Sequence, residues 1–221
     1  KRSGVLAVPH VAPDSSVDIA LPATIPANCG ESFLSVTWSL KKATSWAPKD
    51  HVVAWDQVVL KSQKPARVPV QKQPGDAPKV SPRVTVWRAA VDNDGFKMMP
   101  HLWQGFGRSL ERWLGQGIPT DNADVVSSTT QVEERTDGSV RYLHTVVVPE
   151  ALADLPRIGA TFDVPSRFTQ LRYYGNGPHE NYPDRKASAM LGVWESAPDE
   201  LPYLVPQEFG LRTDCRWMEL I

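Results

Sequence analysis

Apolar and polar residues alternate along several stretches of this chain, which is the pattern of a β-strand with one buried face. In the first sixty residues this alternation predicts a short strand over 17–21 and two longer strands over 34–40 and 52–60. A polar loop that contains proline, residues 41–50, lies between the two longer strands. Two strands joined in this way are typical of a hairpin in a small antiparallel sandwich.

The alternation resumes in the second half of the chain, where prolines separate several of the runs, as in antiparallel meanders. It predicts further strands over residues 84–88, 140–148, 158–162, 168–174, 190–194 and 217–221. Large apolar residues recur at helical spacing over 103–114, and glycines at 115 and 117 end that run. The pattern therefore predicts an all-β fold with one short helix.

Composition divides the chain into two parts. Residues 62–82 are rich in Lys, Gln, Pro, Gly and Ala and hold few large apolar residues, which indicates a linker or a poorly ordered segment. We expect residues 1–61 to form a first unit that is too short for a complete sandwich, and residues 83–221 to form a larger antiparallel unit.

Charge and cysteine content narrow the classes of function. The chain has 24 Lys and Arg against 25 Asp and Glu, so there is no electrostatic reason to expect a nucleic acid or an anionic membrane as partner. No apolar run is long enough to cross a bilayer. Two free thiols, Cys29 and Cys215, in a cytoplasmic protein are a simpler interpretation than one long-range disulfide. No His or Cys cluster has metal-ligand spacing, so we expect no metal site.

The run from Tyr173 to Arg185 carries the most unusual chemistry: aromatics, a Gly-Asn-Gly-Pro turn, two carboxylates, a proline and an arginine. Glycines at 175 and 177 and the fixed φ of Pro178 and Pro183 predict an ordered turn. This run resembles the G-P-x-E-N-Y-P-D-R signature of the large bacterial β-galactosidases, glycoside hydrolase family 2.

Other segments resemble the same family in the same order. Residues 54–57 are similar to the end of its fourth domain, and residues 87–95 are similar to the W-R-A-P-x-D-N-D segment of its fifth. Residues 206–217 resemble its P-Q-E-N-G-x-R segment. This chain has Ala90 where the family usually has Pro, and Phe209 where it usually has Asn.

The resemblance implies the end of an immunoglobulin-like β-sandwich over 1–61 and a β-supersandwich of the galactose-mutarotase type over 83–221, truncated at its C-terminus. Two blocks, near 79–83 and 142–143, look shorter than the family pattern, so we interpret the chain as an excised fragment. It also implies that the parent hydrolyses terminal β-D-galactosides with retention, in lactose catabolism, as a cytoplasmic homo-oligomer. The expected partners are the galactoside and the other domains of the parent. We expect no cofactor here, because the Mg and Na ions of the family are bound in other domains.

Catalysis is expected to lie outside this chain. A retaining glycosidase needs two carboxyl groups about 5 Å apart, and Glu180 with Asp184 would be the tempting pair. The resemblance instead places the catalytic glutamates in a (β/α)₈ barrel, and no alternation of strand and helix of that kind occurs here. We therefore expect the fragment alone to be inactive. The signature residues are predicted to be structural, as acceptors for backbone amides or as an ion pair: Glu180, Asn181, Tyr182, Pro183, Asp184 and Arg185.

The better candidates for contact with substrate are Asp92, Asn93, Asp94 and Gly95. Short polar side chains followed by glycine make a tight turn that displays carboxylate and amide groups suited to sugar hydroxyls. The resemblance implies that the segment just after this motif is a mobile loop beside the mouth of the active site. The alternative is an Asx-turn that only reverses a strand. His179, where many members of the family have Gln, could donate to a sugar oxygen or serve as a polar turn residue.

Two other functions remain open from the sequence. A stand-alone carbohydrate-binding β-sandwich would need an exposed row of aromatic residues. A mutarotase-like aldose epimerase would need a histidine and a carboxylate that converge in a cleft, for which His144 with Glu180 or Asp184 are the candidates.

Overall fold

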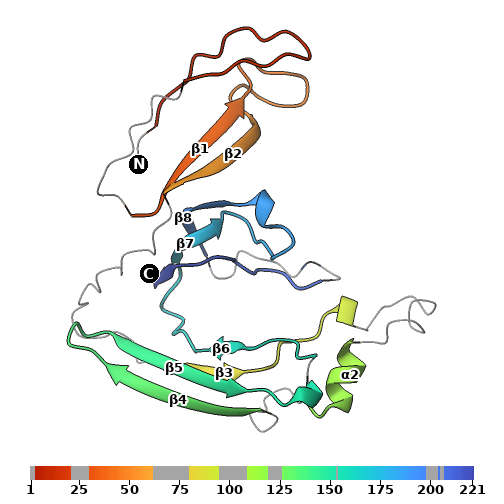
Figure 1. Cartoon of the computed structure of the whole chain (residues 1–221), viewed down its shortest axis with the longest axis vertical. Coiled ribbons are helices and arrows are strands. Elements are labelled where there is room, and N and C mark those ends of the chain that lie inside the picture. The colour runs from red at the N-terminus through yellow and green to blue at the C-terminus, as the bar shows by residue number, and fades with distance from the viewer. Residues whose placement is uncertain are drawn as a thin grey trace. The chain divides into compact units, whose positions relative to one another are not determined.

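The computed structural model forms two compact units, residues 1–66 and residues 67–221 (Figure 1). Placement is described for residues 3–20, 30–61, 80–94, 109–118, 126–152, 154–197, 204 and 207–221. Most of the predicted linker, residues 62–79, lies outside these ranges. All strand pairs among the described residues are antiparallel.

The first unit contains the predicted hairpin. Strand β1 (Ser32–Ser39) pairs with β2 (Val52–Lys61), and the loop between them closes through backbone bonds between Leu40 and both Asp50 and His51. The strand expected over 17–21 is wrong for residues 17–20, which form no ladder. Two apolar side chains of that segment, on Val17 and Ile19, are exposed, so their alternation has no sheet face to cover. Leu21 lies outside the described residues.

A three-stranded sheet in the second unit carries the signature segment. Its order is β8 (Met190–Ser196), β7 (Leu171–Gly177) and β9 (Trp217–Leu220). Strand β7 continues through Gly177, beyond the predicted end at 174, so the first part of the expected turn is in fact strand. A Cβ atom at Gly177 would lie 2.5 Å from Tyr173 Oη and 2.7 Å from Trp194 Cδ1. Any residue with a Cβ atom at 177 would clash with these two aromatic side chains, so their packing requires glycine there.

Two further pairs complete the strands of this unit. Strand β3 (Arg83–Thr85) pairs with β6 (Gly159–Thr161), and both are shorter than predicted. Strand β4 (Ser127–Glu134) pairs with β5 (Val140–Val147). β5 was predicted from its alternation. β4 was not, because its sequence SSTTQVEE has no apolar period and each of its side chains is exposed.

The turn that joins β4 to β5 is closed by its own polar groups. The backbone amide of Arg135 bonds to the carbonyl of Ser139, and the amide and hydroxyl of Ser139 both donate to Asp137 Oδ1. Gly138 has a φ of 83°, in the region that favours glycine.

Helix α2 (Ser109–Gly115) confirms the C-terminal half of the predicted helix, while residues 101–108 lie outside the described ranges. Its Trp113 is part of a core cluster formed by Val86, Trp113, Ile118, Val126 and Leu152. Short 3₁₀ turns occur at η1 (Asp92–Asp94), η2 (Glu150–Leu152) and η3 (Lys186–Ser188). The all-β prediction with one short α-helix is therefore confirmed for the described residues. None of the helices in that part of the chain has the length and apolar character needed to cross a membrane.

Candidate functional site

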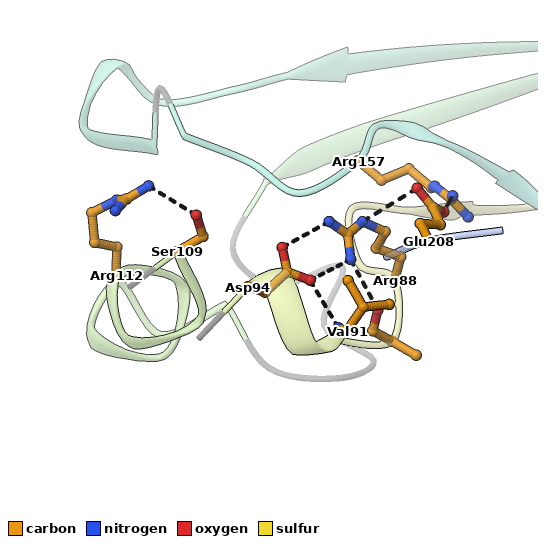
Figure 2. Close-up of polar contacts among 8 residues, drawn as sticks. Arg88, Val91, Asp94, Ser109, Arg112, Arg157 and Glu208 are labelled. Atoms are coloured by element: carbon orange, nitrogen blue, oxygen red, sulfur yellow. Dashed lines mark hydrogen bonds and ion pairs between the residues drawn. The ribbon is translucent and has the colours of Figure 1, made fainter. Parts of the chain in front are cut away.

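The Asp-Asn-Asp motif forms the 3₁₀ turn η1, and a buried ion pair fixes its end (Figure 2). Arg88 holds the Asp94 carboxylate through two bonds, Nη1 to Oδ2 at 2.6 Å and Nη2 to Oδ1 at 3.0 Å. The backbone amide of Val91 donates to Asp94 Oδ2 at 2.9 Å, while the amide of Asp94 donates to the Val91 carbonyl. The side chains of Arg88 and Asp94 are only 16% and 9% exposed. Asp94 is therefore a structural anchor and not a displayed carboxylate.

A second ion pair extends this anchor toward the C-terminal segment. Arg88 Nε lies 3.7 Å from Glu208 Oε2, and Arg157 donates to Glu208 Oε1 (Figure 2). The Arg88 guanidinium also lies over the ring of Trp113, 5.3 Å from its centroid. The hydrogen bond to Asp94 raises the pKa of Arg88, and the charges of Asp94 and Glu208 raise it further, against the opposing effect of burial. Arg88 thus contacts Asp94, Glu208 and Trp113, and it is the centre of the cluster that these residues form with Arg157.

The signature Glu180–Arg185 ties β7 to the segment that leads into β9. Asn181 is fully buried, and its Nδ2 donates to the carbonyls of Asn176 and His179, both at 3.1 Å. Its Oδ1 accepts from the amide and the hydroxyl of Thr213. The side-chain amide of Asn181 therefore joins three parts of the chain, at Asn176, His179 and Thr213.

Glu180 and Arg185 form the ion pair that the sequence suggested. Glu180 is buried, and its Oε1 accepts a hydrogen bond from Arg185 Nη2, which raises the pKa of Arg185. Between them, Tyr182 is half-buried. Burial raises the pKa of its phenol, and the charge of Glu208 raises it further. Tyr182 thus brings the signature beside the Arg88 and Glu208 network.

The two sequence motifs meet in one cavity, called here the polar cavity, with a volume of about 280 Å³. Its lining comes from three segments: Arg88, Val91, Asn93 and Asp94; Tyr182, Asp184 and Arg185; Gln207 and Glu208. The buried pair Arg88–Asp94 forms part of it, and the exposed residues Asn93, Asp184 and Gln207 surround that pair. The side chains of these three exposed residues make no hydrogen bond within the described part of the chain. For Asp184 this differs from the predicted structural role as an acceptor or ion-pair partner. Donors and acceptors are therefore available there to a ligand.

A second cavity of about 430 Å³, called here the apolar cavity, adjoins the first. It shares Arg88, Val91 and Glu208 with the polar cavity and adds Ala89, Ala90, Arg157 and Phe209. Four of its seven lining residues are apolar. The two cavities therefore differ in chemistry and have a common wall.

The predicted rim residues do not all reach these cavities. Asn93 and Asp94 line the polar cavity, whereas Asp92 is half-buried and does not. Gly95 lies outside the described residues, so its role as a hinge stays a prediction. His179 is exposed, its Nε2 lies 3.2 Å from Ser188 Oγ, and it lines neither cavity.

Sequence reasoning missed Arg88 and Glu208 as members of the site. Both stand in segments that resemble the family, but no local pattern indicates that they meet. Within the described ranges, no group of three or more His, Cys, Asp or Glu side chains could hold a metal ion. The cluster's carboxylates at 94, 180 and 208 are each held by an arginine.

Comparison with protein families gives two matches along the chain. The model described as "Beta galactosidase small chain" matches residues 68–221, and that described as "Beta-galactosidase, domain 4" matches residues 1–61.

Similar proteins share this description. A β-galactosidase of Arthrobacter sp. (strain B7) is 30% identical over 272 residues, which cover 93% of this chain and 26% of that protein. A β-galactosidase of Priestia megaterium is 27% identical over 265 residues (94% and 25%), and one of Klebsiella pneumoniae is 27% identical over 281 (94% and 26%). The chain thus spans about a quarter of the length of these relatives. Each alignment is longer than the 221 residues of this chain, so each relative has residues without a counterpart here.

Proposed function

Because the chain belongs to the β-galactosidase family, over both domain 4 and the small chain, we propose that it is the C-terminal part of an enzyme that hydrolyses terminal β-D-galactosides with retention. In this proposal the chain completes the rim of the active site and contributes to assembly of a cytoplasmic homo-oligomer. The catalytic carboxylates, and the Mg and Na ions expected for the parent, belong to other parts of that enzyme.

The arginine partners of the carboxylates in this chain support the assignment of catalysis to other parts of the enzyme. A retaining mechanism needs one carboxylic acid that protonates the leaving group and one carboxylate that attacks the sugar. Asp94, Glu180 and Glu208 are instead held by Arg88, Arg185 and Arg157. A carboxylate oxygen in a charge-assisted bond to arginine is occupied by that donor, which suits a structural role better than a catalytic one.

The observation that carries the proposal is the meeting of the two family motifs in the polar cavity. Asn93, Asp184 and Gln207 present amide and carboxylate groups at its exposed side. Planar amide and carboxylate groups offer donors and acceptors at fixed spacing, which suits neighbouring hydroxyl groups of a sugar. A volume of about 280 Å³ is close to the lower end of ligand pockets, about 300–1,000 Å³. We propose that this cavity receives the glucose unit of lactose when galactose occupies the active site.

The two alternative functions gain no support from the described residues. His144 Nδ1 lies 2.8 Å from Thr130 Oγ1 in the β4–β5 pair, whereas Glu180 pairs with Arg185, so the described contacts of these two epimerase candidates are with other residues. Exposed aromatic side chains in that part of the chain are Trp38 and Trp46 in the first unit and Phe162 in the second.

The test uses the full-length enzyme that carries this chain, with Asn93→Ala. If Asn93 bonds to a glucose hydroxyl, kcat/KM for lactose should fall about three- to tenfold, the cost of one hydrogen bond. The value for a simple aryl galactoside should stay within about twofold. Gln131→Ala is the control, because Gln131 is an exposed amide side chain of the same unit that lines neither cavity. An equal response of both substrates, or of neither, would refute the role of the polar cavity.

A second measurement addresses catalysis directly. The purified 221-residue chain should release no product from a chromogenic β-galactoside. Turnover that disappears in Glu180→Gln would show that a carboxylate of this chain acts in the reaction, and the proposed division would be wrong.

A further inference from the structure

Strand β4 has a free edge. β5 pairs with β4 along its whole length, and no other strand of the described residues pairs with it (Figure 1). Such an edge presents a row of unpaired backbone N–H and C=O groups, which can pair with another strand. Proteins often protect a long edge strand with lysine, proline or a bulge. The sequence SSTTQVEE contains neither lysine nor proline, and its register with β5 has no bulge. The edge is therefore open to a partner strand.

The turn shows which residues of β4 direct their backbone groups outward. The amide of Arg135 donates to the carbonyl of Ser139, so these two residues form a bonded pair. Bonded and non-bonded pairs alternate in an antiparallel ladder, and the register of β4 with β5 is regular. The residues that point their N–H and C=O groups away from β5 are therefore Ser128, Thr130, Val132 and Glu134. The 2.8 Å contact of Thr130 with His144 agrees, because side chains approach most closely in non-bonded pairs.

The sequence of β4 is complementary to itself when two copies run antiparallel. Hydroxyl side chains fill its first half, and two carboxylates lie at its end. An antiparallel copy centred on Gln131 places Glu133 opposite Thr129. The same register places Glu134 opposite Ser128, so each carboxylate faces a hydroxyl donor. A parallel copy in register would instead bring like charges side by side, which is destabilising.

A second copy of β4 would also pair the open edge completely. In the register centred on Gln131, Thr130 faces Val132, and each residue with outward backbone groups meets another of the same kind. The result is one antiparallel sheet of four strands, with β5 and β4 of one copy followed by β4 and β5 of the other. An isolated two-stranded hairpin is marginally stable, whereas three or more strands support one another.

We propose that β4 docks onto β4 of a second copy of this chain, antiparallel about a twofold axis at Gln131. The same surface serves both copies, as in an isologous dimer. Backbone hydrogen bonds supply the affinity, as in other cases of strand addition. The inference rests on the proposed function for its place in the parent enzyme, because it names a surface for the proposed assembly.

Sedimentation velocity of the 221-residue chain measures the association. One strand edge buries less area than a standard interface of about 1,600 Å², so we expect a Kd of about 1–100 μM. Val132→Pro removes one outward N–H from each copy and no bond to β5, and it should raise Kd about tenfold or more. The matched controls Val132→Ala and Gln131→Ala keep all outward N–H groups and should leave Kd within about threefold. In the full-length enzyme, Val132→Pro should lower the mass of the assembly.

A cross-link tests the register without proline. Gln131→Cys should form a disulfide-linked dimer under mild oxidation, since opposed residues of a non-bonded pair lie about 4.5 Å apart between Cα atoms, which suits a disulfide. Thr129→Cys is the control, because it would face Glu133 of the other copy and should form no such dimer. The unmodified chain gives the background from its own cysteines. This test also decides the matter if Val132→Pro unfolds the chain.

The outcomes separate this inference from the proposed function. A chain that stays monomeric at about 100 μM, or a dimer that Gln131→Cys fails to link, would overturn the pairing of β4. A dimer linked through Thr129→Cys instead would also overturn it, and so would an unchanged assembly mass in folded full-length Val132→Pro. Hydrolysis of a chromogenic galactoside by the unmodified full-length enzyme reads the proposed function alone. Its absence would refute that function and leave the dimer of the 221-residue chain in place.

Discussion

Replacing Asp94 by asparagine should destabilise the second unit more than the same substitution at an exposed aspartate. The substitution keeps the shape of the side chain and removes the negative charge that Arg88 faces. Arg88 would remain in a site where only 16% of its side chain is exposed. A buried charge without its partner is costly because it has lost water and gained no compensating group.

The size of the loss in the free energy of unfolding follows from the contacts of Asp94 and Arg88. Removal of one partner of a buried ion pair typically costs about 3–5 kcal/mol. Glu208 still lies 3.7 Å from Arg88 Nε, and the asparagine oxygen can still accept from the Val91 amide. We therefore expect the free energy of unfolding to fall by about 3 kcal/mol, at the lower end of that range.

Urea unfolding of the 221-residue chain, followed by tryptophan fluorescence, measures this loss. The Arg88 guanidinium lies over the ring of Trp113, whose centroid is 6.1 Å from that of Trp87. The fluorescence signal therefore includes the region that is changed. The control is Asp163→Asn, because the Arg83–Asp163 pair is 67% and 85% exposed. A surface pair of that kind should contribute less than about 0.5 kcal/mol.

A double substitution separates the lost charge from a general disturbance. Arg88→Met combined with Asp94→Asn should cost less than the sum of the single changes, because no charge then remains buried without a partner. The pKa of Arg88 is raised by its hydrogen bond to Asp94, so this contribution to stability is fully present below the ordinary pKa of arginine and is lost only as pH rises through the folded value. The difference between variant and wild type that comes from Arg88 should thus be constant from about pH 6 to 9. A loss no larger than that of Asp163→Asn would refute the reasoning.

Three further changes test the signature segment. Asn181→Ala should lower the free energy of unfolding by about 3 kcal/mol in urea, since the carbonyls that it served and Thr213 would be left buried without their partner; a loss below about 1 kcal/mol would contradict this. Arg185→Ala should lower the melting temperature of the full-length enzyme before it changes the chemical step, because buried Glu180 loses its cation; an unchanged melting temperature with a large fall in kcat would show the opposite. Burial raises the pKa of Tyr182 above its unfolded value of about 10, so its contribution to stability is present below about pH 10 and is lost as pH rises through the folded value. Stability measured from pH 9 to 11 should therefore fall less steeply in Tyr182→Phe, and an identical slope would refute this assignment.

Strands were predictable where side chains on one face are less exposed than those on the other. β5 and β8 begin and end close to the predicted residues, and half-buried side chains alternate with exposed ones along much of each strand. β2 also lies close to its predicted bounds, although its valines at 52, 53, 58 and 59 are exposed. β4 could not be predicted, since its pairing with β5 is backbone hydrogen bonding that leaves all its side chains exposed. The segment 17–20 shows the reverse case, in which alternation occurs and no partner strand forms.

The site was predictable as a set of motifs but not as a geometry. Short polar residues indicated a turn at Asp92–Gly95, and η1 forms at its described residues. Which side chain of the motif is displayed depends on Arg88, which buries Asp94 and leaves Asn93 exposed. Glu208 joins the cluster from a segment far along the chain, and contacts between distant segments leave no local period in the sequence.

The exposed side of the β4–β5 pair has a consequence for how this part of the family can diverge. Where one face of a strand is buried, a shift of one residue would expose its apolar side chains to water. Insertions and deletions in such a strand are therefore selected against. No side chain of β4 is buried, and the Arg135–Ser139 turn sets its register. An insertion or deletion at that turn would slide β4 along β5 at the cost of contacts such as Thr130 with His144, without opening the core. Lengthening a surface connection costs little in chain entropy. This hairpin is therefore a position where homologous chains can gain or lose residues by neutral drift.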